Sequence, residues 1–163
     1  MMLRGRCWKF GDDVPTDAIV PEKNLFKSFD EMAQQALATL NPAFPTGVQR
    51  GDIVVAGKHF GCSSGRAVAV KALAATGIGG VVAETFARTF YRNSFEIGLP
   101  ILECPGITSL ANEGDLLRVD VATGQVVNET TGQTLQAPPP PPFLLEMLRA
   151  GGIIPYSEHL AGA

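Results

Sequence analysis

Residues 53–66 read IVVAGKHFGCSSGR, an apolar run followed by a glycine-rich segment that carries two serines, a cysteine and an arginine. The run Ile53–Ala56 predicts a buried strand, and Ala67–Ala75, whose only charge is Lys71, predicts a helix buried on most sides. A strand, a glycine-rich turn and a helix start place backbone N–H groups and the positive helix end around a small space, which favours an anion. Arg66 adds a fork of donors suited to a carboxylate. The sequence therefore predicts a site for an anionic substrate in this loop.

The same loop permits other interpretations. It is not a phosphate-binding P-loop, because no Gly-Lys-Ser/Thr follows its second glycine. Gly61–Gly65 matches the Gly-x-Ser-x-Gly elbow of hydrolases with Ser63 as nucleophile, but the chain is short for that fold and its only downstream histidine is His159. Cys62 with His59 as base is less favoured, since nothing orients two residues of one turn. A tight turn that only permits close strand–helix packing is the remaining alternative.

The composition limits the function classes. The chain has 163 residues, is 45% apolar and carries a net charge of −3, so residues 1–163 are expected to form a single domain with one core. No apolar run approaches a membrane span, and the N-terminus does not resemble a signal peptide; the cytoplasmic location is indicated by the cysteines, described below. Scattered lysines and arginines with few aromatic residues argue against nucleic acid. Cys7, Cys62 and Cys104 lie far apart, which argues for a reducing compartment and against a metal or iron–sulfur site held by this chain alone.

Hydrophobic periodicity predicts alternating strands and helices up to residue 103. Ser28 and Glu31 form a capping box that starts an apolar-faced helix running to about Leu40. The other elements expected in this part are the strand Gly5–Phe10, the loop Gly11–Pro21, the strands Asp52–Ala56 and Gly80–Ala83, the helix Thr85–Ile97 ended by Gly98, and the strand Ile101–Glu103. This rhythm implies parallel pairing and right-handed crossovers.

After Gly114 the pattern changes to short runs separated by Thr-Gly pairs, as in hairpins. Pro138–Pro142 is expected to be a rigid spacer before an amphipathic helix at Phe143–Arg149, and the tail 157–163 is expected to fray. The expected strands are Leu116–Val121, Val126–Asn128 and Thr134–Ala137. The fold class is therefore α/β: a mainly parallel sheet flanked by helices, plus a small antiparallel sheet packed on it.

Eight segments, taken in their order and spacing, carry a specific resemblance to one family. They are Trp8–Asp12, Thr16–Pro21, Gly51–Gly57, His59–Cys62, Phe86–Asn93, Gly98–Cys104, Pro141–Leu145 and Ala150–Tyr156. With these segments the chain resembles the small subunit of 3-isopropylmalate dehydratase, the detached swivelling domain of the aconitase superfamily. The resemblance spans nearly the whole chain and implies an aconitase swivel-type (β/β/α) domain and a role in leucine biosynthesis.

The resemblance also implies a hydro-lyase that dehydrates and isomerises a 2-hydroxy-dicarboxylate. In this family a [4Fe–4S] cluster on a separate large subunit binds the substrate, and the small subunit covers that cluster. By motif position, Ser64 corresponds to the serine base, Arg66 to the arginine that grips a carboxylate, and Asp17 to the acidic residue after threonine. Ser63 and Gly65 belong to the same substrate-binding loop. The resemblance thus implies a large-subunit partner and no cofactor on this chain, and a homo-oligomer of the chain alone stays open.

Other roles are open for these residues when the chain is considered without the resemblance. Ser64 could equally serve as a helix cap, and Arg66 could pair with a carboxylate at a helix start. Asp17 could close an Asx-turn. Cys62 is best explained as a small packing residue.

The glycine-rich loop departs from the family pattern Gly-Cys-Gly-Ser-Ser-Arg-Glu-His-Ala. Residues 61–69 read GCSSGRAVA, so Gly65 replaces the second serine and Ala67-Val68 replace the Glu-His pair. Pro15 stands where the family has the first Asp of Asp-Thr-Asp. These departures leave open a paralogue for another hydroxy acid, of the methylated malate or homoaconitate type, or a non-catalytic partner subunit.

The segment after Pro21 bears on substrate selectivity. In family members that accept an additional carboxylate, the loop after Ile-x-Pro carries an arginine, and that place falls at or beside Phe26, next to Lys27. Leu25 and Phe26 offer apolar surface, where a desolvated carboxylate would lack a partner. The sequence therefore predicts a preference for an apolar or small substituent, as in isopropylmalate or a methylated malate, over homocitrate-like tricarboxylates.

Overall fold

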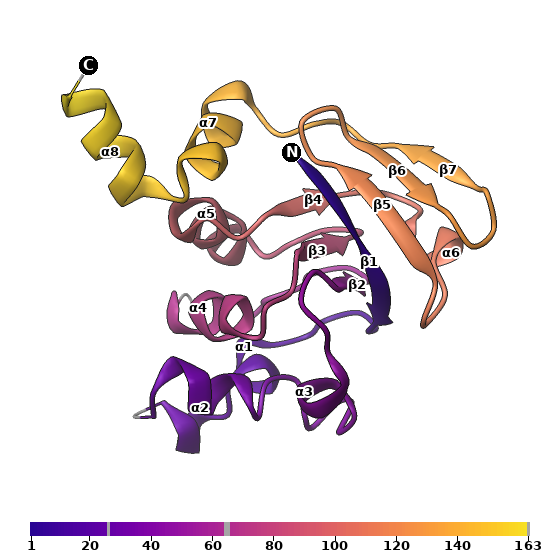
Figure 1. The fold of residues 1–163 in the computed structure, drawn as a ribbon. Helices are drawn as coiled ribbons and strands as arrows, with labels where there is room; N and C mark the ends of the chain where they lie inside the picture. Colours follow the sequence, from indigo (N-terminus) through magenta and orange to yellow (C-terminus); the bar gives the residue numbers. More distant parts are fainter. Residues whose placement is uncertain (26, 64–65, 163) are drawn as a thin grey trace.

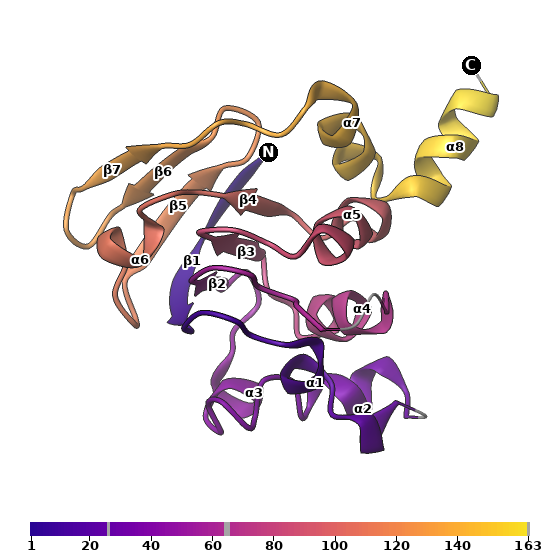
Figure 2. The same cartoon turned by 180° about the vertical axis from the view of Figure 1, so that it is seen from behind.

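The protein forms one seven-stranded sheet in the order β4-β3-β2-β1-β5-β6-β7, with most helices on one side of it (Figures 1 and 2). The structure is a computed structural model and describes residues 1–25, 27–63 and 66–162. The strands are β1 (Met2–Lys9), β2 (Ile53–Ala56), β3 (Gly80–Ala83), β4 (Ile101–Glu103), β5 (Leu116–Asp120), β6 (Gln125–Asn128) and β7 (Thr134–Gln136). The helices are α1 (Thr16–Ile19), the 3-10 turn η1 (Glu22–Asn24), α2 (Phe29–Ala33), α3 (Phe44–Gly47), α4 (Val68–Ala75), α5 (Arg88–Ile97), α6 (Ile107–Leu110), α7 (Pro142–Ala150) and α8 (Ile153–Ala161).

The parallel half of the sheet consists of β4, β3, β2 and the end of β1. Every residue of β2 and β3 is buried, because helices or loops cover both faces, and this explains their continuous apolar runs. Figures 1 and 2 show α4 and α5 against one face of the sheet. The short helix α6 also contacts β2 and β3. The predicted strand–helix rhythm of this half is confirmed.

β1 belongs to both halves of the sheet. Its last residues, Cys7–Lys9, pair with β2 in parallel, whereas Met2–Arg6 pair with β5 in antiparallel register. β5, β6 and β7 then continue as antiparallel neighbours. The mixed α/β class is confirmed, but the antiparallel strands extend the parallel sheet and do not form a second sheet packed on it. The length of β1 explains this, since it is long enough to offer one pairing edge to each half.

The predicted helix from Ser28 to Leu40 is shorter than expected. Its start is confirmed, because the Ser28 hydroxyl accepts the Glu31 N–H at 3.2 Å, but α2 ends at Ala33. Leu37 is fully buried with a left-handed φ of 56°, and its N–H donates to the carbonyl of Ala18 at 3.1 Å. Packing of this leucine against the segment 16–20 therefore replaces the second helical turn.

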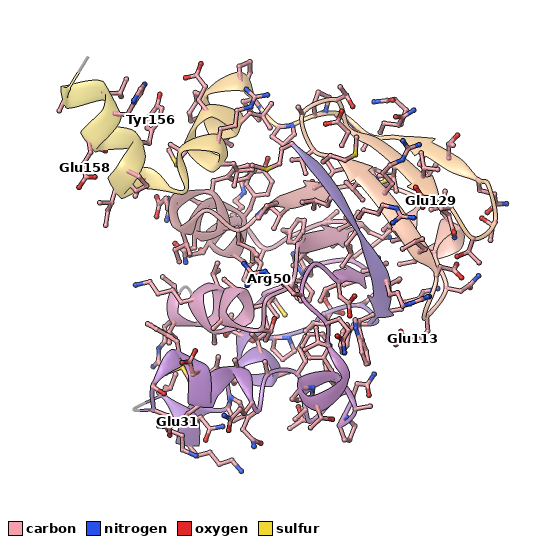
Figure 3. All side chains as sticks on the ribbon, viewed as in Figure 1. Glu31, Arg50, Glu113, Glu129, Tyr156 and Glu158 are labelled. Carbon is pink, nitrogen blue, oxygen red and sulfur yellow. The ribbon has the colours of Figure 1, made fainter. Side chains whose placement is uncertain are left out.

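The C-terminal segment ends in α8, which extends as far as Ala161 and so includes most of the tail expected to fray from residue 157. This helix contacts α5 and α7 but buries none of its own residues, and Figure 3 shows Tyr156 and Glu158 on it, away from the sheet. In the parts of the chain that the structure describes, no helix has both the length and the apolar character needed to cross a bilayer.

Candidate functional site

Three loops follow the carboxyl ends of β1, β2 and β3 and meet at one edge of the sheet. They comprise residues 10–15, 57–67 and 84–87. In open sheets of parallel strands, ligands bind in the crevice outside this edge. The glycine-rich segment identified from the sequence is the middle loop of the three.

The first two loops run side by side and are joined through their backbones. The Gly57 N–H donates to the Gly11 carbonyl at 3.0 Å, and the Gly61 N–H donates to the Val14 carbonyl at 2.8 Å. Further along, the Thr16 N–H donates to the Cys62 carbonyl at 2.9 Å. These bonds fix the first loop against the glycine-rich loop. Asp17 follows the first loop, in α1. The predicted loop Gly11–Pro21 is therefore only partly a loop, since α1 starts inside it.

The glycine-rich loop is held on its other side by the third loop. The Phe60 N–H donates to the Thr85 carbonyl at 3.1 Å, and the Ala87 N–H donates to the Phe60 carbonyl at 3.0 Å. The ring of Phe60 is buried against Phe86 and Phe90, with centroids 6.0 and 5.2 Å away in edge-on geometry. The aromatic cluster of Phe60, Phe86 and Phe90 thus anchors the glycine-rich loop to the buried core.

Several residues of these loops have a left-handed backbone. φ is 54° at Asp13, 62° at His59, 82° at Gly61 and 84° at Ser63. This region is unfavourable for residues with a side chain, and such strain gathers at functional sites when the surrounding structure holds it. His59 Nδ1 and Asp13 Oδ1 lie 3.7 Å apart, but both side chains are exposed, so this contact adds little stability.

A pocket opens between α1, η1 and the start of α4. Its cavity volume is about 20 Å³, and its lining includes both Asp17 and Arg66. Its lining consists of Thr16, Asp17, Val20, Glu22, Leu25, Arg66, Val68 and Ala69. The lining mixes apolar side chains with one guanidinium and two carboxylates, and Arg66 supplies the cation that a carboxylate would need.

The start of α4 contributes a further feature to this pocket. Ala67, which has no side-chain acceptor, stands at the N-cap, and Val68 and Ala69 of the first turn line the pocket. The N–H groups of a first helical turn and the helix dipole attract an anion. The anionic-substrate interpretation of the loop is consistent with this arrangement.

The remaining predicted site residues divide into two groups. Ser63 is described, and it is exposed with a left-handed backbone outside the lining of the pocket. Ser64, Gly65 and Phe26 lie outside the described residues. Sequence reasoning missed Thr16 and Glu22 as pocket residues, and the only signal for them was their place in the segment that follows the first loop.

The buried cysteines are unsuited to chemistry at neutral pH. Burial, with a smaller contribution from Glu113 and Asp115, raises the pKa of Cys7 to about 12. Burial and the charge of Glu84 raise the pKa of Cys104 to about 11. Both are therefore thiols, and thiols are poor nucleophiles and metal ligands. Within the described residues, no three His, Cys, Asp or Glu side chains are grouped to hold a metal ion.

Glu84, at the end of β3, anchors the edge of the sheet next to the site. Its carboxylate accepts the Thr108 hydroxyl at 2.7 Å and the N–H groups of Gly106 and Thr108 at 2.8 and 3.1 Å. Desolvation alone would raise the pKa of Glu84, but these hydrogen bonds outweigh it and the pKa lies below its ordinary value of 4.5. Glu84 is thus an ionised structural group that fixes the start of α6.

Comparison with known proteins identifies relatives along the whole chain. Residues 16–105 match the family model described as the aconitase C-terminal domain. The isopropylmalate/citramalate isomerase small subunit of Methanocaldococcus jannaschii is 47% identical over 156 residues, which cover 95% of this chain and 93% of that protein. The 3-isopropylmalate dehydratase small subunit of Thermodesulfovibrio yellowstonii is 42% identical over 159 residues, or 97% of this chain and 95% of that protein.

A solved structure supports the same relationship. The crystal structure of 3-isopropylmalate dehydratase from Methanocaldococcus jannaschii superposes with a TM-score of 0.93 at 36% sequence identity. The match covers 99% of this chain and 96% of that one. The similarity therefore includes both halves of the sheet as well as the loops at its edge.

Proposed function

Because the chain belongs to the family of 3-isopropylmalate dehydratase small subunits, which contain the aconitase C-terminal domain, we propose that it acts with a large subunit on a 2-hydroxy-dicarboxylate in leucine biosynthesis. The reaction is that of a hydro-lyase. The observation that carries the proposal is the pocket whose lining combines Arg66 and Asp17 with apolar side chains. We treat residues 1–163 as one domain in this role.

Arg66 is the proposed carboxylate clamp. Its guanidinium is permanently charged and offers paired donors in a planar fork, which match the two oxygens of a carboxylate. The first turn of α4 adds N–H groups and the positive end of the helix dipole beside it. Asp17 is the proposed partner that orients a substrate hydroxyl or the clamp itself.

Ser64 is the proposed base that removes the carbon-bound proton. A serine alkoxide is costly in water, so it needs a positive environment, and Arg66 and the N–H groups around the helix start are the available sources. This role comes from the correspondence with the family motif. Arg66, the proposed source of positive charge, lines the pocket.

The proposed [4Fe–4S] cluster belongs to the large subunit. Cys7 and Cys104 are buried thiols with raised pKa values, which makes them poor cluster ligands. When bound, such a cluster supplies a Lewis acid for the substrate hydroxyl. The residues of this chain bind the carboxylate, exclude water and hold the proton.

The pocket also bears on which substituent the substrate carries. Leu25 and Val20 present apolar surface, and the carboxylate of Glu22 would repel a further anionic group. With Phe26 at or beside the family's selectivity position, we propose a preference for isopropylmalate or a methylated malate over tricarboxylates. A methylated malate is the second candidate substrate because a relative at 47% identity is named an isopropylmalate/citramalate isomerase small subunit.

Substrate selectivity is tested by comparing kcat/KM for 3-isopropylmalate and for a homocitrate-like tricarboxylate in the reconstituted two-subunit enzyme. The expected result is higher kcat/KM for 3-isopropylmalate. A clear preference for the tricarboxylate would mean that Lys27, or a group on the large subunit, binds the additional carboxylate that Phe26 is proposed to exclude.

The roles of the serines are tested in the same enzyme. Ser64→Ala is expected to abolish turnover with little change in substrate binding, because a base acts in the transition state. Arg66→Lys is expected mainly to raise KM, because the bidentate grip is lost. If Ser63→Ala is inactive while Ser64→Ala is active, the hydrolase-like elbow is the correct assignment. If neither serine matters, the chain is a non-catalytic partner.

A further inference from the structure

Two buried polar side-chain atoms in the described part of the chain have no hydrogen-bond partner. They are the Thr16 hydroxyl Oγ1 and the Asn24 amide Nδ2. Thr16 is 5% exposed and Asn24 is 1% exposed, so solvent does not serve either group. Buried groups without a partner are rare and destabilising in native proteins, and each calls for a physical explanation.

The backbone N–H and carbonyl of Thr16 both have hydrogen-bond partners, and only its hydroxyl has none. Its N–H donates to the Cys62 carbonyl at 2.9 Å, and its own carbonyl accepts the Val20 N–H at 2.8 Å. Threonine and serine hydroxyls in helices ordinarily bond to a carbonyl three or four residues earlier, as Thr76 does with Leu73 at 2.6 Å in this chain. Thr16 is the first residue of α1, so no helical turn precedes it to supply that carbonyl.

The place of Thr16 differs from that of Asn24. Thr16 lines the pocket with Asp17 and Arg66, whereas Asn24 is not part of the lining. The hydrogen bond from the Thr16 N–H to the Cys62 carbonyl, next to the bridge between Pro15 and Cys62, ties this residue directly to the glycine-rich loop. Thr16 therefore stands at the junction of the two loops and lines the same pocket as the Arg66 cation.

We infer that Thr16 is a substrate-binding residue, whose hydroxyl donates a hydrogen bond to a carboxylate oxygen of the substrate that Arg66 neutralises. The inference rests on the proposed function. Substrate binding gives the hydroxyl the partner that it lacks in the chain alone. The hydroxyl is buried in the chain alone, so the inference requires that the pocket open at Thr16 when the substrate binds.

A threonine-to-valine exchange separates this role from a structural one, because valine has the shape of threonine without the hydroxyl. Thr16→Val, Thr16→Ser and the control Thr76→Val are compared in two measurements. The first is urea unfolding of each purified chain. The second is kcat and KM for 3-isopropylmalate, in the enzyme reconstituted with a cluster-bearing large subunit of the family.

The expected result is a Thr16→Val chain at least as stable as the unmodified one, since an unsatisfied buried hydroxyl has been removed. In the reconstituted enzyme its KM rises about tenfold with kcat little changed, because a ground-state contact is lost. Thr16→Ser restores most of the lost affinity. The control Thr76→Val loses stability, because its hydroxyl is bonded in the folded chain, and keeps its KM.

Two results overturn the inference while the proposed function stands. One is an unchanged kcat/KM for Thr16→Val in an active enzyme, and the other is a stability loss for Thr16→Val as large as that of Thr76→Val. If the unmodified enzyme turns over neither 3-isopropylmalate nor a methylated malate, the proposed function fails and the role of Thr16 fails with it.

Discussion

The two halves of the sheet form their turns differently. Between β5 and β7, the described residues with a left-handed backbone are the glycines Gly124 and Gly132. At the carboxyl edge of the parallel half, Asp13, His59 and Ser63 adopt this backbone although each carries a side chain. A left-handed residue with a side chain costs about 1–2 kcal/mol relative to a relaxed backbone.

The contrast shows where the molecule accepts strain. The hairpins of the antiparallel half use the residue type that each turn favours, so they need no external support. The loops of the parallel edge keep unfavourable conformations because neighbouring backbones and buried aromatic rings fix them. Strain that is maintained in this way is expected where chemistry dictates the shape of a loop.

The largest effect is expected from Gly61→Ala. Gly61 has a φ of 82°, and a Cβ there would overlap the ring of Phe90, so the change adds both backbone strain and a steric clash. The free energy of unfolding should fall by about 3 kcal/mol. Urea unfolding measures this, with Gly11→Ala as the control, since a Cβ at Gly11 meets nothing within 4 Å. Equal stability of the two variants would contradict the supporting role of the aromatic cluster.

A smaller effect is expected from Glu84→Gln, which replaces a carboxylate that accepts three hydrogen bonds by a neutral amide with a single acceptor oxygen. The loss of stability should be about 2 kcal/mol at neutral pH, because donors lose a charged partner. The pKa of Glu84 is lower in the folded chain than the ordinary 4.5. The charge of Glu84 therefore stabilises the fold fully above pH 4.5, and this stabilisation is lost as the pH falls through the lowered pKa.

Urea unfolding between neutral pH and pH 3 tests the role of Glu84. The difference between Glu84→Gln and the unmodified chain should shrink as the pH falls below 4.5. A constant difference across this range would show that Glu84 contributes through packing and not through its charge. Activity at neutral pH should be unchanged in the folded variant, because Glu84 fixes α6 and does not line the pocket.

Much of the parallel half could be predicted from the sequence, because β2, β3, α4 and α5 are each specified by a local apolar pattern. The glycine-rich loop and the family resemblance predict Arg66 and Asp17 as site residues, and both line the pocket. Thr16 and Glu22 were missed as pocket residues because α1 and η1 are too short to show a periodicity. Their positions depend on bonds between distant segments, such as that from Thr16 to Cys62, which no local pattern encodes.

The left-handed residues were missed for a related reason. A glycine in a sequence indicates that a left-handed backbone is possible, whereas Asp13 and His59 give no such indication. Their left-handed backbone is imposed by the hydrogen bonds between the paired loops. The same applies to Leu37, whose burial under α1 ends the helix that the periodicity predicted. In each case a tertiary contact overrides a local preference.

The smallest effects sharpen the contrast between the halves. Gly132→Ala should lose about 1 kcal/mol of stability, because its φ of 81° is retained while a Cβ there meets nothing within 4 Å. His59→Gly should lose nothing or gain up to about 0.5 kcal/mol, because relief of strain offsets the greater freedom of the unfolded chain. Urea unfolding decides both, and a clear loss for His59→Gly would mean that its loop is not strained.

In the proposed function, this chain supplies one side of a hydro-lyase site that a large subunit completes. The most direct test is turnover of 3-isopropylmalate under anaerobic conditions by this chain, by a cluster-bearing large subunit of the family, and by increasing ratios of the two. Turnover is expected only in the mixture, and it should reach a plateau once every large subunit is occupied. Turnover by this chain alone, or turnover by the large subunit that this chain does not increase, would contradict this division of the site between two subunits.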